Sequence, residues 1–200
     1  MADKQHQQLT INQKVVHWAH GHLGKPVKIP GGKAECWDLA EKALQQAGAQ
    51  TSTDLGPVGA DTNYIWGEPI KDIKDVEPGD ILQLRDHVVT TITKTQYTFP
   101  DGSQVTDTET EDAKRGHHTA IVTSQLDQHG AVKTLEQHVK PLGKVVQNKK
   151  LYTRDVQPVV TQTVAKHRNP STKKIETAKV TKTVTITVTG TIWAYKPKPK

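Results

Sequence analysis

The sequence has a single cysteine, a single methionine and a single phenylalanine among its 200 residues. One cysteine excludes an internal disulfide, so cysteine usage says nothing about the compartment. Aromatic residues make up only 4% of the chain, so a core must be built mainly from valine, isoleucine, leucine and alanine. No apolar run approaches the ~20 residues of a membrane-spanning helix, and the polar start MADKQHQQLT is not a secretory signal. We expect a soluble chain without a membrane span, and its localisation stays unknown.

Charge is distributed unevenly along the chain. Residues 1–138 carry 13 Lys and Arg against 19 Asp and Glu, whereas residues 139–200 carry 14 against 2. The basic C-terminal region indicates either a solvated, lysine-rich face or attraction to a polyanion, such as nucleic acid or an anionic cell-envelope polymer. The polar residues 1–10 and the final segment KPKPK, at 196–200, are expected to be flexible ends.

Two helices are predicted in the N-terminal part. In residues 11–23 the apolar positions recur at helical spacing. Residues 35–47 place small residues along one helical face, and Gly48 is a natural C-terminal stop. Residues 49–79 are rich in Gly, Pro and Asp, so they are expected to form loops with a short helical piece at 63–66.

Alternating, β-branched segments dominate the rest of the chain. The turn sequences FPDGSQV and NPSTKK predict hairpins, and helices followed by an antiparallel sheet indicate an α+β fold. We expect one domain over residues 1–200, elaborated by hairpins at 88–116 and 151–182. The predicted strands are residues 81–85, 87–99, 118–124, 131–139, 151–165 and 183–195.

The only cysteine opens the second predicted helix, in the stretch GGKAECWDLAEKAL. A helix N-terminus favours negative charge, and therefore the reactive thiolate form of Cys36. Its unpaired backbone N–H groups can also hold an oxyanion, and the two preceding glycines let a substrate approach the backbone. The alternative is that Cys36 is a small buried hydrophobic residue on an alanine-rich face.

Alternation along the strands selects a base for this thiol among ten histidines. In HHTAIV, His118 shares a face with Ala120 and Val122, which indicates that this face packs against the helix layer. On the next strand Glu136 and His138 share a face, so either could lie beside His118 if the two strands are neighbours. A nucleophile, a base and an acid that orients the base form the arrangement of nucleophilic catalysis.

These residues lie within segments that resemble the papain-like amidases and peptidases of the CHAP and NlpC types. The resemblance implies a papain-like α+β fold in which N-terminal helices pack on an antiparallel sheet. It gives Cys36 the role of nucleophile, His118 that of base and Glu136 that of the orienting acid. The matching segments, in the family's order, are VVHWAHGHLGKPV, GGKAECWDLAEKALQQAGA, DVEPGDILQLRD, HHTAIV, LEQH and GTIWAYKP.

The resemblance also implies an activity, which is amide hydrolysis through a thioester without a cofactor. The implied substrates are peptides or peptidoglycan-like amides, and a cell-wall hydrolase would act outside the cytoplasm. We expect a monomer. Glu35 and His138 stand where the family often has Gln and Asn, so they are candidates for supporting the oxyanion and the imidazole.

Two tryptophans are candidates for the walls of a substrate cleft. Trp37 follows the cysteine, and Trp66 lies in the Gly- and Pro-rich region before the strands; each could instead be a core residue. Asp80, which follows a Pro-Gly pair, is predicted to be a turn residue.

The histidines leave metal binding open as a minor alternative. The H-x-x-H-x-H segment at residues 17–22 has no HExxH or paired-cysteine motif beside it, so surface histidines are the favoured interpretation. A second set, Cys36, His118, Glu136 and His138, could hold a metal with the same residues as the catalytic hypothesis. We predict no metal site.

A different class of function also stays open. The chain could be a non-catalytic module that keeps the fold and binds a polyanion through residues 139–200. Slow alkylation of Cys36 and salt-sensitive binding of a polyanion would distinguish this module from an enzyme.

Overall fold

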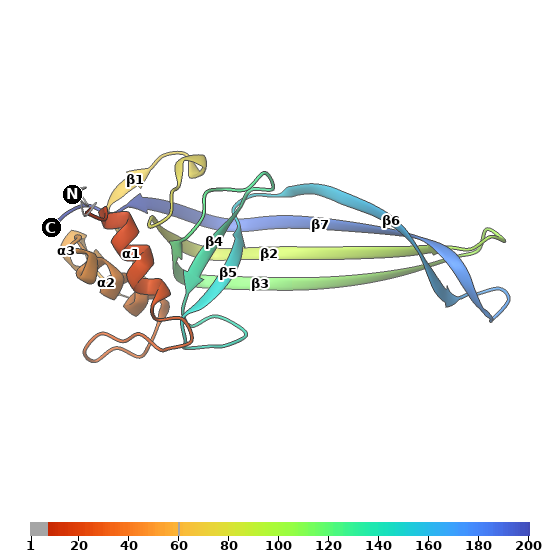
Figure 1. The fold of residues 1–200 in the computed structure, drawn as a ribbon, viewed down its shortest axis with the longest axis horizontal. Helices are drawn as coiled ribbons and strands as arrows, with labels where there is room; N and C mark the ends of the chain where they lie inside the picture. The colour runs from red at the N-terminus through yellow and green to blue at the C-terminus, as the bar shows by residue number, and fades with distance from the viewer. Residues whose placement is uncertain (1–7, 60) are drawn as a thin grey trace, which may run out of the picture. The chain divides into compact units, whose positions relative to one another are not determined.

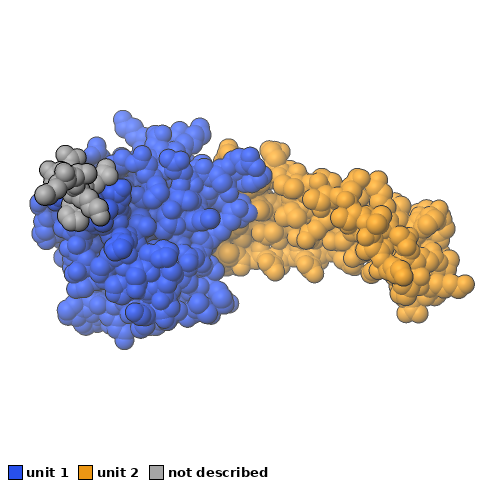
Figure 2. Space-filling view, viewed as in Figure 1, with its two compact units in different colours: residues 1–87, 115–153, 190–200 blue, residues 88–114, 154–189 orange. Residues whose placement is uncertain are grey.

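The computed structural model describes residues 8–59 and 61–200, which divide into two compact units (Figures 1 and 2). The expected flexible segment at residues 1–7 lies outside the described residues. The hairpin elaborations expected at 88–116 and 151–182 fall mostly in unit 2. Unit 1 takes its residues from the ranges 1–87, 115–153 and 190–200, and unit 2 takes 88–114 and 154–189.

The helices belong to unit 1 and are α1 (Ile11–His20), α2 (Cys36–Ala47) and α3 (Ser52–Leu55) (Figure 1). At the start of α1, the Gln13 N–H donates to Thr10 Oγ1 at 3.2 Å, and the Thr10 N–H donates to Gln13 Oε1 at 2.9 Å. These bonds satisfy donors that every helix start leaves free. The helix ends at His20 rather than at residue 23, and Gly48, with φ 73°, ends α2 as predicted.

The short helix predicted at residues 63–66 is not found there; the one-turn helix α3 forms earlier in the chain. Its position follows from Glu41, whose buried carboxylate on α2 accepts bonds from the Ser52 N–H at 3.1 Å and the Ser52 hydroxyl at 2.9 Å. This contact between separate segments left no local pattern in the sequence.

The strands form one sheet in the order β1-β7-β2-β3-β4-β5, with β6 paired to β7. The registered pairs β1–β7, β3–β4, β4–β5 and β6–β7 are antiparallel, as predicted. Residues 81–85 and 87–99, predicted as two strands, form the single strand β2, and the segment predicted at 151–165 divides between β5 and β6. The strands are β1 (Glu68–Ile70), β2 (Ile81–Thr98), β3 (Gln104–Val122), β4 (Ala131–Glu136), β5 (Gln147–Tyr152), β6 (Val156–Arg168) and β7 (Ile175–Lys196).

The core of unit 1 forms two apolar clusters on its sheet. The first cluster joins α1 and α2 to strand residues such as Ile121 and Leu135. The second contains Ala120, Val122 and Val132 together with residues of the loop before β2. Successive strand residues thus pack into different clusters, as the pleat requires.

The expectation that Ala120 and Val122 face the helix layer is therefore wrong, because Ile121 packs there instead. The argument from alternation assumed that one face of the strand is solvated. Here both faces are covered, so small and apolar residues do not mark the helix side.

Unit 2 consists of the outer parts of the β2–β3 and β6–β7 hairpins, with few buried residues. Its turn at 169–174 forms as predicted. Asn169, which has no exposed surface, donates from its amide to Asp101 at 3.1 Å and to Glu176 at 2.9 Å. His167 stacks on Tyr97 with ring centroids 4.0 Å apart. These contacts join the tips of the two hairpins within unit 2.

The C-terminal segment at 196–200 is held in place, contrary to the prediction of a flexible end. The Gln50 N–H donates to the Lys198 carbonyl at 2.8 Å, and the Lys200 N–H donates to the Gly48 carbonyl at 3.1 Å. The Lys200 Nζ also lies 3.0 Å from an Asp54 carboxylate oxygen. The prediction was wrong because a segment of lysine and proline has no local pattern of order. The groups that hold its backbone, at Gly48 and Gln50, are far away in the chain.

In the described part of the chain, no helix is both long and apolar enough to cross a membrane.

Candidate active site

Cys36 is the first residue of α2, and its side chain is half-buried. Its Sγ lies 4.0 Å from the carbonyl oxygen of His117, and Cys36 is among the groups that raise the pKa of the His118 imidazole. The helix start is held by the Glu35 N–H, which donates to Asp38 Oδ2 at 3.0 Å. The thiol is therefore fixed at the helix N-terminus and next to β3.

His118 on β3 is only 6% exposed, and its Nε2 donates to Glu136 Oε2 at 3.0 Å. Burial opposes the charged imidazolium. The interactions with Cys36 and Glu136 outweigh burial and raise the pKa of His118 to about 9. At neutral pH His118 is therefore an imidazolium paired with the Glu136 carboxylate.

Glu136 on β4 has no exposed surface, and three side chains donate to its carboxylate. Arg115 donates from Nε to Oε2 at 2.8 Å and from Nη2 to Oε1 at 3.2 Å. Thr134 donates to Oε1 at 2.7 Å, and His118 completes the set. Burial would raise the pKa of Glu136, but the bond to His118 and the charge of Arg115 lower it to about 2.

Sequence reasoning missed Arg115, which is 5% exposed and forms a buried ion pair with Glu136. Strict alternation puts Arg115 and His118 on opposite faces of the strand, so the pattern did not group them. The available signal was chemical: a buried acid needs a partner of opposite charge, and Arg is suited to two-pronged contact with a carboxylate.

Glu35 and His138 pair with each other instead of supporting His118. The His138 Nδ1 contacts the Glu35 carboxylate, and the Lys144 Nζ lies 3.2 Å from Glu35 Oε1. The strand β4 ends at Glu136, and His138 adopts φ 61°, so the predicted shared face of Glu136 and His138 is not formed. The carboxylate beside the nucleophile thus has the Lys144 ammonium and the His138 ring as its partners.

Gln137, between the two residues that sequence reasoning selected, is fully buried and was missed. Its Nε2 donates to the carbonyls of Val27 and Glu35, both at 2.8 Å, and its Oε1 accepts the Val27 N–H at 2.7 Å. Gln137 thus ties β4 to the loop that leads into Cys36.

A cavity of about 380 Å³ lies against the start of α2. Trp37 and Tyr64 are aromatic residues of its lining, with ring centroids 6.2 Å apart, and Trp37 donates from Nε1 to Ser52 Oγ at 2.7 Å. Burial and then the charge of Cys36 raise the pKa of Tyr64. The lining comprises residues 29–33, Glu35, Trp37, Asp38 and Tyr64.

Trp66 does not form a cleft wall, because its side chain has no exposed surface. It belongs to the helix-side cluster and donates from Nε1 to Gln83 Oε1 at 3.1 Å. Asp80 is a buried turn residue, as predicted, and accepts bonds from the Glu77 N–H at 2.7 Å and from Asn12 at 2.8 Å.

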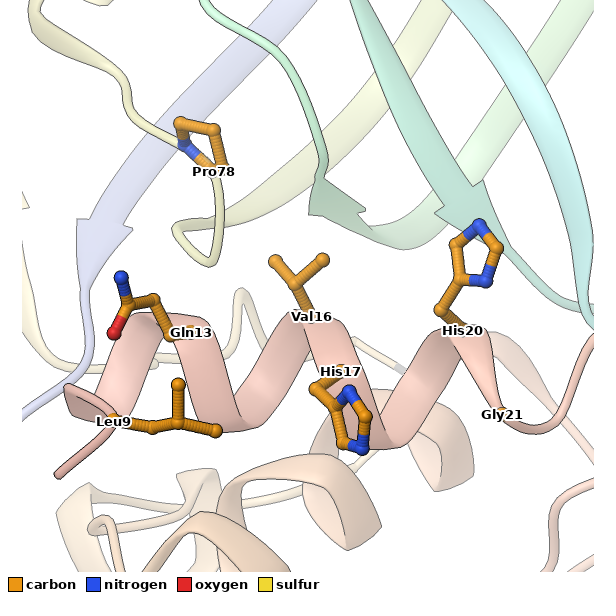
Figure 3. A pocket seen from close by; sticks show the side chains of 7 residues that line it. All are labelled: Leu9, Gln13, Val16, His17, His20, Gly21 and Pro78. Carbon is orange, nitrogen blue, oxygen red and sulfur yellow. The ribbon is translucent and has the colours of Figure 1, made fainter. Parts of the chain in front are cut away.

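A second cavity, of about 580 Å³, lies along α1 (Figure 3). In Figure 3 the side chains of Gln13, Val16 and His20 project from the helix, with Pro78 across from them. Cys36, His118 and Glu136 are not among its lining residues, so it is separate from the candidate active site.

Among residues 8–59 and 61–200, no group of three or more His, Cys, Asp and Glu side chains is placed to hold a metal ion. The alternative four-ligand set is not assembled, because His138 contacts Glu35. In the H-x-x-H-x-H segment, the His22 Nδ1 lies 2.8 Å from the Trp18 carbonyl oxygen.

The half-buried thiol at a helix start, the imidazole on the sheet and the carboxylate on the next strand define the class: a cysteine proteinase-type fold of helices on an antiparallel sheet. A family model described as the AIM3/BBC1 cysteine proteinase-fold domain matches residues 4–157, and the chain belongs to this family. Comparisons with curated proteins and with solved structures find no match. The family supports a papain-like fold without specifying the CHAP or NlpC families.

Proposed function

We propose that this domain is a cysteine-dependent hydrolase of amide bonds. Cys36 is the nucleophile, His118 transfers the protons and Glu136 positions the imidazole. The observation that carries the proposal is the charged series formed by Cys36 at a helix start and the buried pair of His118 and Glu136, in which His118 lies 3.0 Å from Glu136 and Cys36 helps to raise the pKa of His118. Burying this charged series costs free energy, so a role for its charges is the simplest reason to keep it.

The reaction follows from the charges of the site. The His118 imidazolium stabilises the Cys36 thiolate, and the sulfur attacks the amide carbonyl carbon to form a C–S bond. Backbone N–H groups at the start of α2 receive the negative charge that moves to the carbonyl oxygen. The C–N bond then breaks while His118 gives its proton to the leaving amine. His118 next takes a proton from water, whose oxygen displaces the sulfur and releases the acid.

Three further residues act as positioning residues in this proposal. Arg115 and Thr134 hold the Glu136 carboxylate by its two oxygens, so the carboxylate has one remaining direction for His118. Gln137 fixes the carbonyl of Glu35, the residue before the nucleophile. Their contribution is preorganisation of the site rather than contact with substrate.

The substrate class proposed is a peptide amide that enters over the cavity beside Trp37 and Tyr64. Peptidoglycan peptides are one candidate within this class, and the sequence resemblance to cell-wall peptidases is what favours them. Purified peptidoglycan and a fluorogenic peptide library, assayed in parallel, distinguish the general proposal from this narrower one. Cleavage of peptides without cleavage of peptidoglycan would leave the activity and remove the cell-wall substrate.

The chain offers a direct test, because Cys36 is its only cysteine and thiol labelling reports on it alone. Cys36→Ala should abolish amide cleavage, and His118→Gln should reduce it by roughly 10²–10⁴-fold. The exposed His129→Gln is the matched control and should cleave like the parent protein. Wild-type cleavage by Cys36→Ala would reject the proposal.

A non-catalytic binding module is the second candidate, and Glu35 favours it. Its carboxylate lies beside the nucleophile, where an amide side chain able to donate to an oxyanion is common in the resembling families. Slow alkylation of Cys36 below pH 7, together with no cleavage of the peptide library, would favour this module over the hydrolase.

A further inference from the structure

The β6–β7 hairpin in unit 2 exposes apolar and basic side chains on one face. The register pairs Val164 with Lys179 and Arg168 with Ile175, so these side chains point to the same side of the hairpin. Val164 is 73% exposed and Ile175 is 65% exposed, which is unusual for large apolar residues on paired strands. We call this surface the basic face; it comprises Val160, Val164, Lys166, Arg168, Ile175 and Lys179.

The outer part of β3 has the opposite character. Residues 106–114 are exposed throughout, and residues 102–113 contain no Lys or Arg. Asp107, Glu109 and Glu111 alternate with threonines and therefore share one side of the strand. We call residues 104–114 the acidic edge.

Both surfaces lie on outer strands of unit 2. In the strand order, β6 pairs only with β7 and the acidic edge pairs on only one side, because β3 meets β4 at Ile121 and Val122. β6 is 13 residues long, and its residues 157–166 are all exposed. Long edges of this kind have free backbone N–H and C=O groups that can bind another strand.

We propose that the basic face and edge of β6 bind the acidic edge of β3 in a second copy of this chain. Backbone pairing between the strands supplies the hydrogen bonds, and the opposite charges select the partner strand and orient it. The contact uses different surfaces on the two copies, so it can propagate beyond a dimer. It differs from the monomer expected from the sequence, and it is independent of the proposed activity.

The acidic edge is the reason to choose a second copy over a polyanion or an anionic membrane. Either of these partners would neutralise Lys166, Arg168 and Lys179 but would leave Asp107, Glu109 and Glu111 without an oppositely charged partner. A second copy satisfies both charged surfaces at once and also places a strand beside Val160 and Val164 of β6. The complementarity is therefore internal to the chain.

Sedimentation velocity on the full chain over a range of concentrations tests the proposal. We expect the parent protein to associate at low salt and to return toward the monomer as salt screens the contact. Two triple variants, D107K/E109K/E111K and K166E/R168E/K179E, should each remain monomeric where the parent associates. An equimolar mixture of the two should associate again, because each supplies the charge that the other has lost.

A matched control reverses three exposed lysines of unit 1, K28E/K71E/K133E, and changes the net charge by the same amount as the basic-face variant. It should associate like the parent protein. Circular dichroism checks that each variant is folded. A parent protein that stays monomeric throughout, or reversed variants that still associate alone, would overturn the proposal. Binding of heparin or of phosphatidylserine vesicles by a monomeric parent protein, lost in K166E/R168E/K179E, would overturn it in favour of a polyanion.

Discussion

Unit 1 and unit 2 share the strands β2, β3 and β7, yet they bury their side chains very differently. In unit 1 the strands pack between a helix-side cluster and a second apolar cluster. In unit 2, β6 is exposed on both faces over residues 157–166. The same kind of alternating strand thus serves as a buried scaffold in one unit and as an open surface in the other.

This difference matches the chemistry that each unit can support. The buried Arg115, His118 and Glu136 interact strongly because little water screens them. The charges of unit 2 lie in solvent and act through complementarity over a surface instead. Burial on both faces is therefore what allows unit 1 to hold charged groups in one fixed arrangement.

The largest change in stability, and so the clearest contrast between the two units, is expected at the buried ion pair of Arg115 and Glu136 in unit 1. Glu136→Gln leaves the Arg115 guanidinium buried without its counter-charge and should cost roughly 3–5 kcal/mol of unfolding free energy. The double variant Arg115→Met with Glu136→Leu should be more stable than Glu136→Gln, because no buried guanidinium is left unpaired and His118, without its carboxylate partner, can become neutral by losing its proton. Urea unfolding measures both; a double variant that is less stable than Glu136→Gln would contradict the buried-pair account.

Core truncation should show a somewhat smaller contrast between the units. Leu44 on α2 has no exposed surface, so Leu44→Ala should cost about 2–5 kcal/mol. Val164 on β6 is 73% exposed, and Val164→Ala should change stability by no more than about 0.5 kcal/mol. Thermal and urea unfolding at low protein concentration compare them. Equal costs at the two sites would mean that unit 2 is packed as tightly as unit 1.

Asn169 offers a weaker effect that should stay within unit 2. Asn169→Ala removes the amide bonds to Asp101 and Glu176 and should cost roughly 1–3 kcal/mol locally. Hydrogen exchange should then be faster in the hairpin tips and unchanged in α2 and β4. The alkylation rate of Cys36 is the control, and a change in that rate would show that the two units are coupled.

A further expected effect is a pH dependence of stability confined to unit 1. The pKa of His118 is raised to about 9 from an ordinary value near 6.5. Its charged form therefore stabilises the fold fully below about pH 6.5, and this contribution is lost as pH rises through about 9. His118→Gln should remove this part of the alkaline decline in stability. An identical decline in the variant and in the parent protein would assign it to other groups.

Local patterns predicted the start and end of α2, the two hairpin turns and strands at the positions of β2, β3 and β4. Alternation also selected His118 and Glu136, which form a buried pair, although its premise that Ala120 and Val122 face the helices is wrong. Local patterns failed where distant segments decide the outcome: Arg115 reaches Glu136 despite the alternation, and Glu41 fixes α3. The prediction of a flexible C-terminal segment was wrong for the same reason, because the partners of its lysines at residues 48–54 are distant in the chain. The periodicity of neighbouring residues carries no information about contacts between residues far apart in the sequence.

The place of β7 in the strand order has a practical consequence for dividing the protein. The family match stops at residue 157, but Ala194 and Tyr195 of β7 are buried in the two clusters of unit 1. β7 also stands between β1 and β2. A truncated gene product that ends with the matched segment would lack an interior strand of its own sheet. Recombinant fragments and domain grafts should therefore retain the chain through its final lysine.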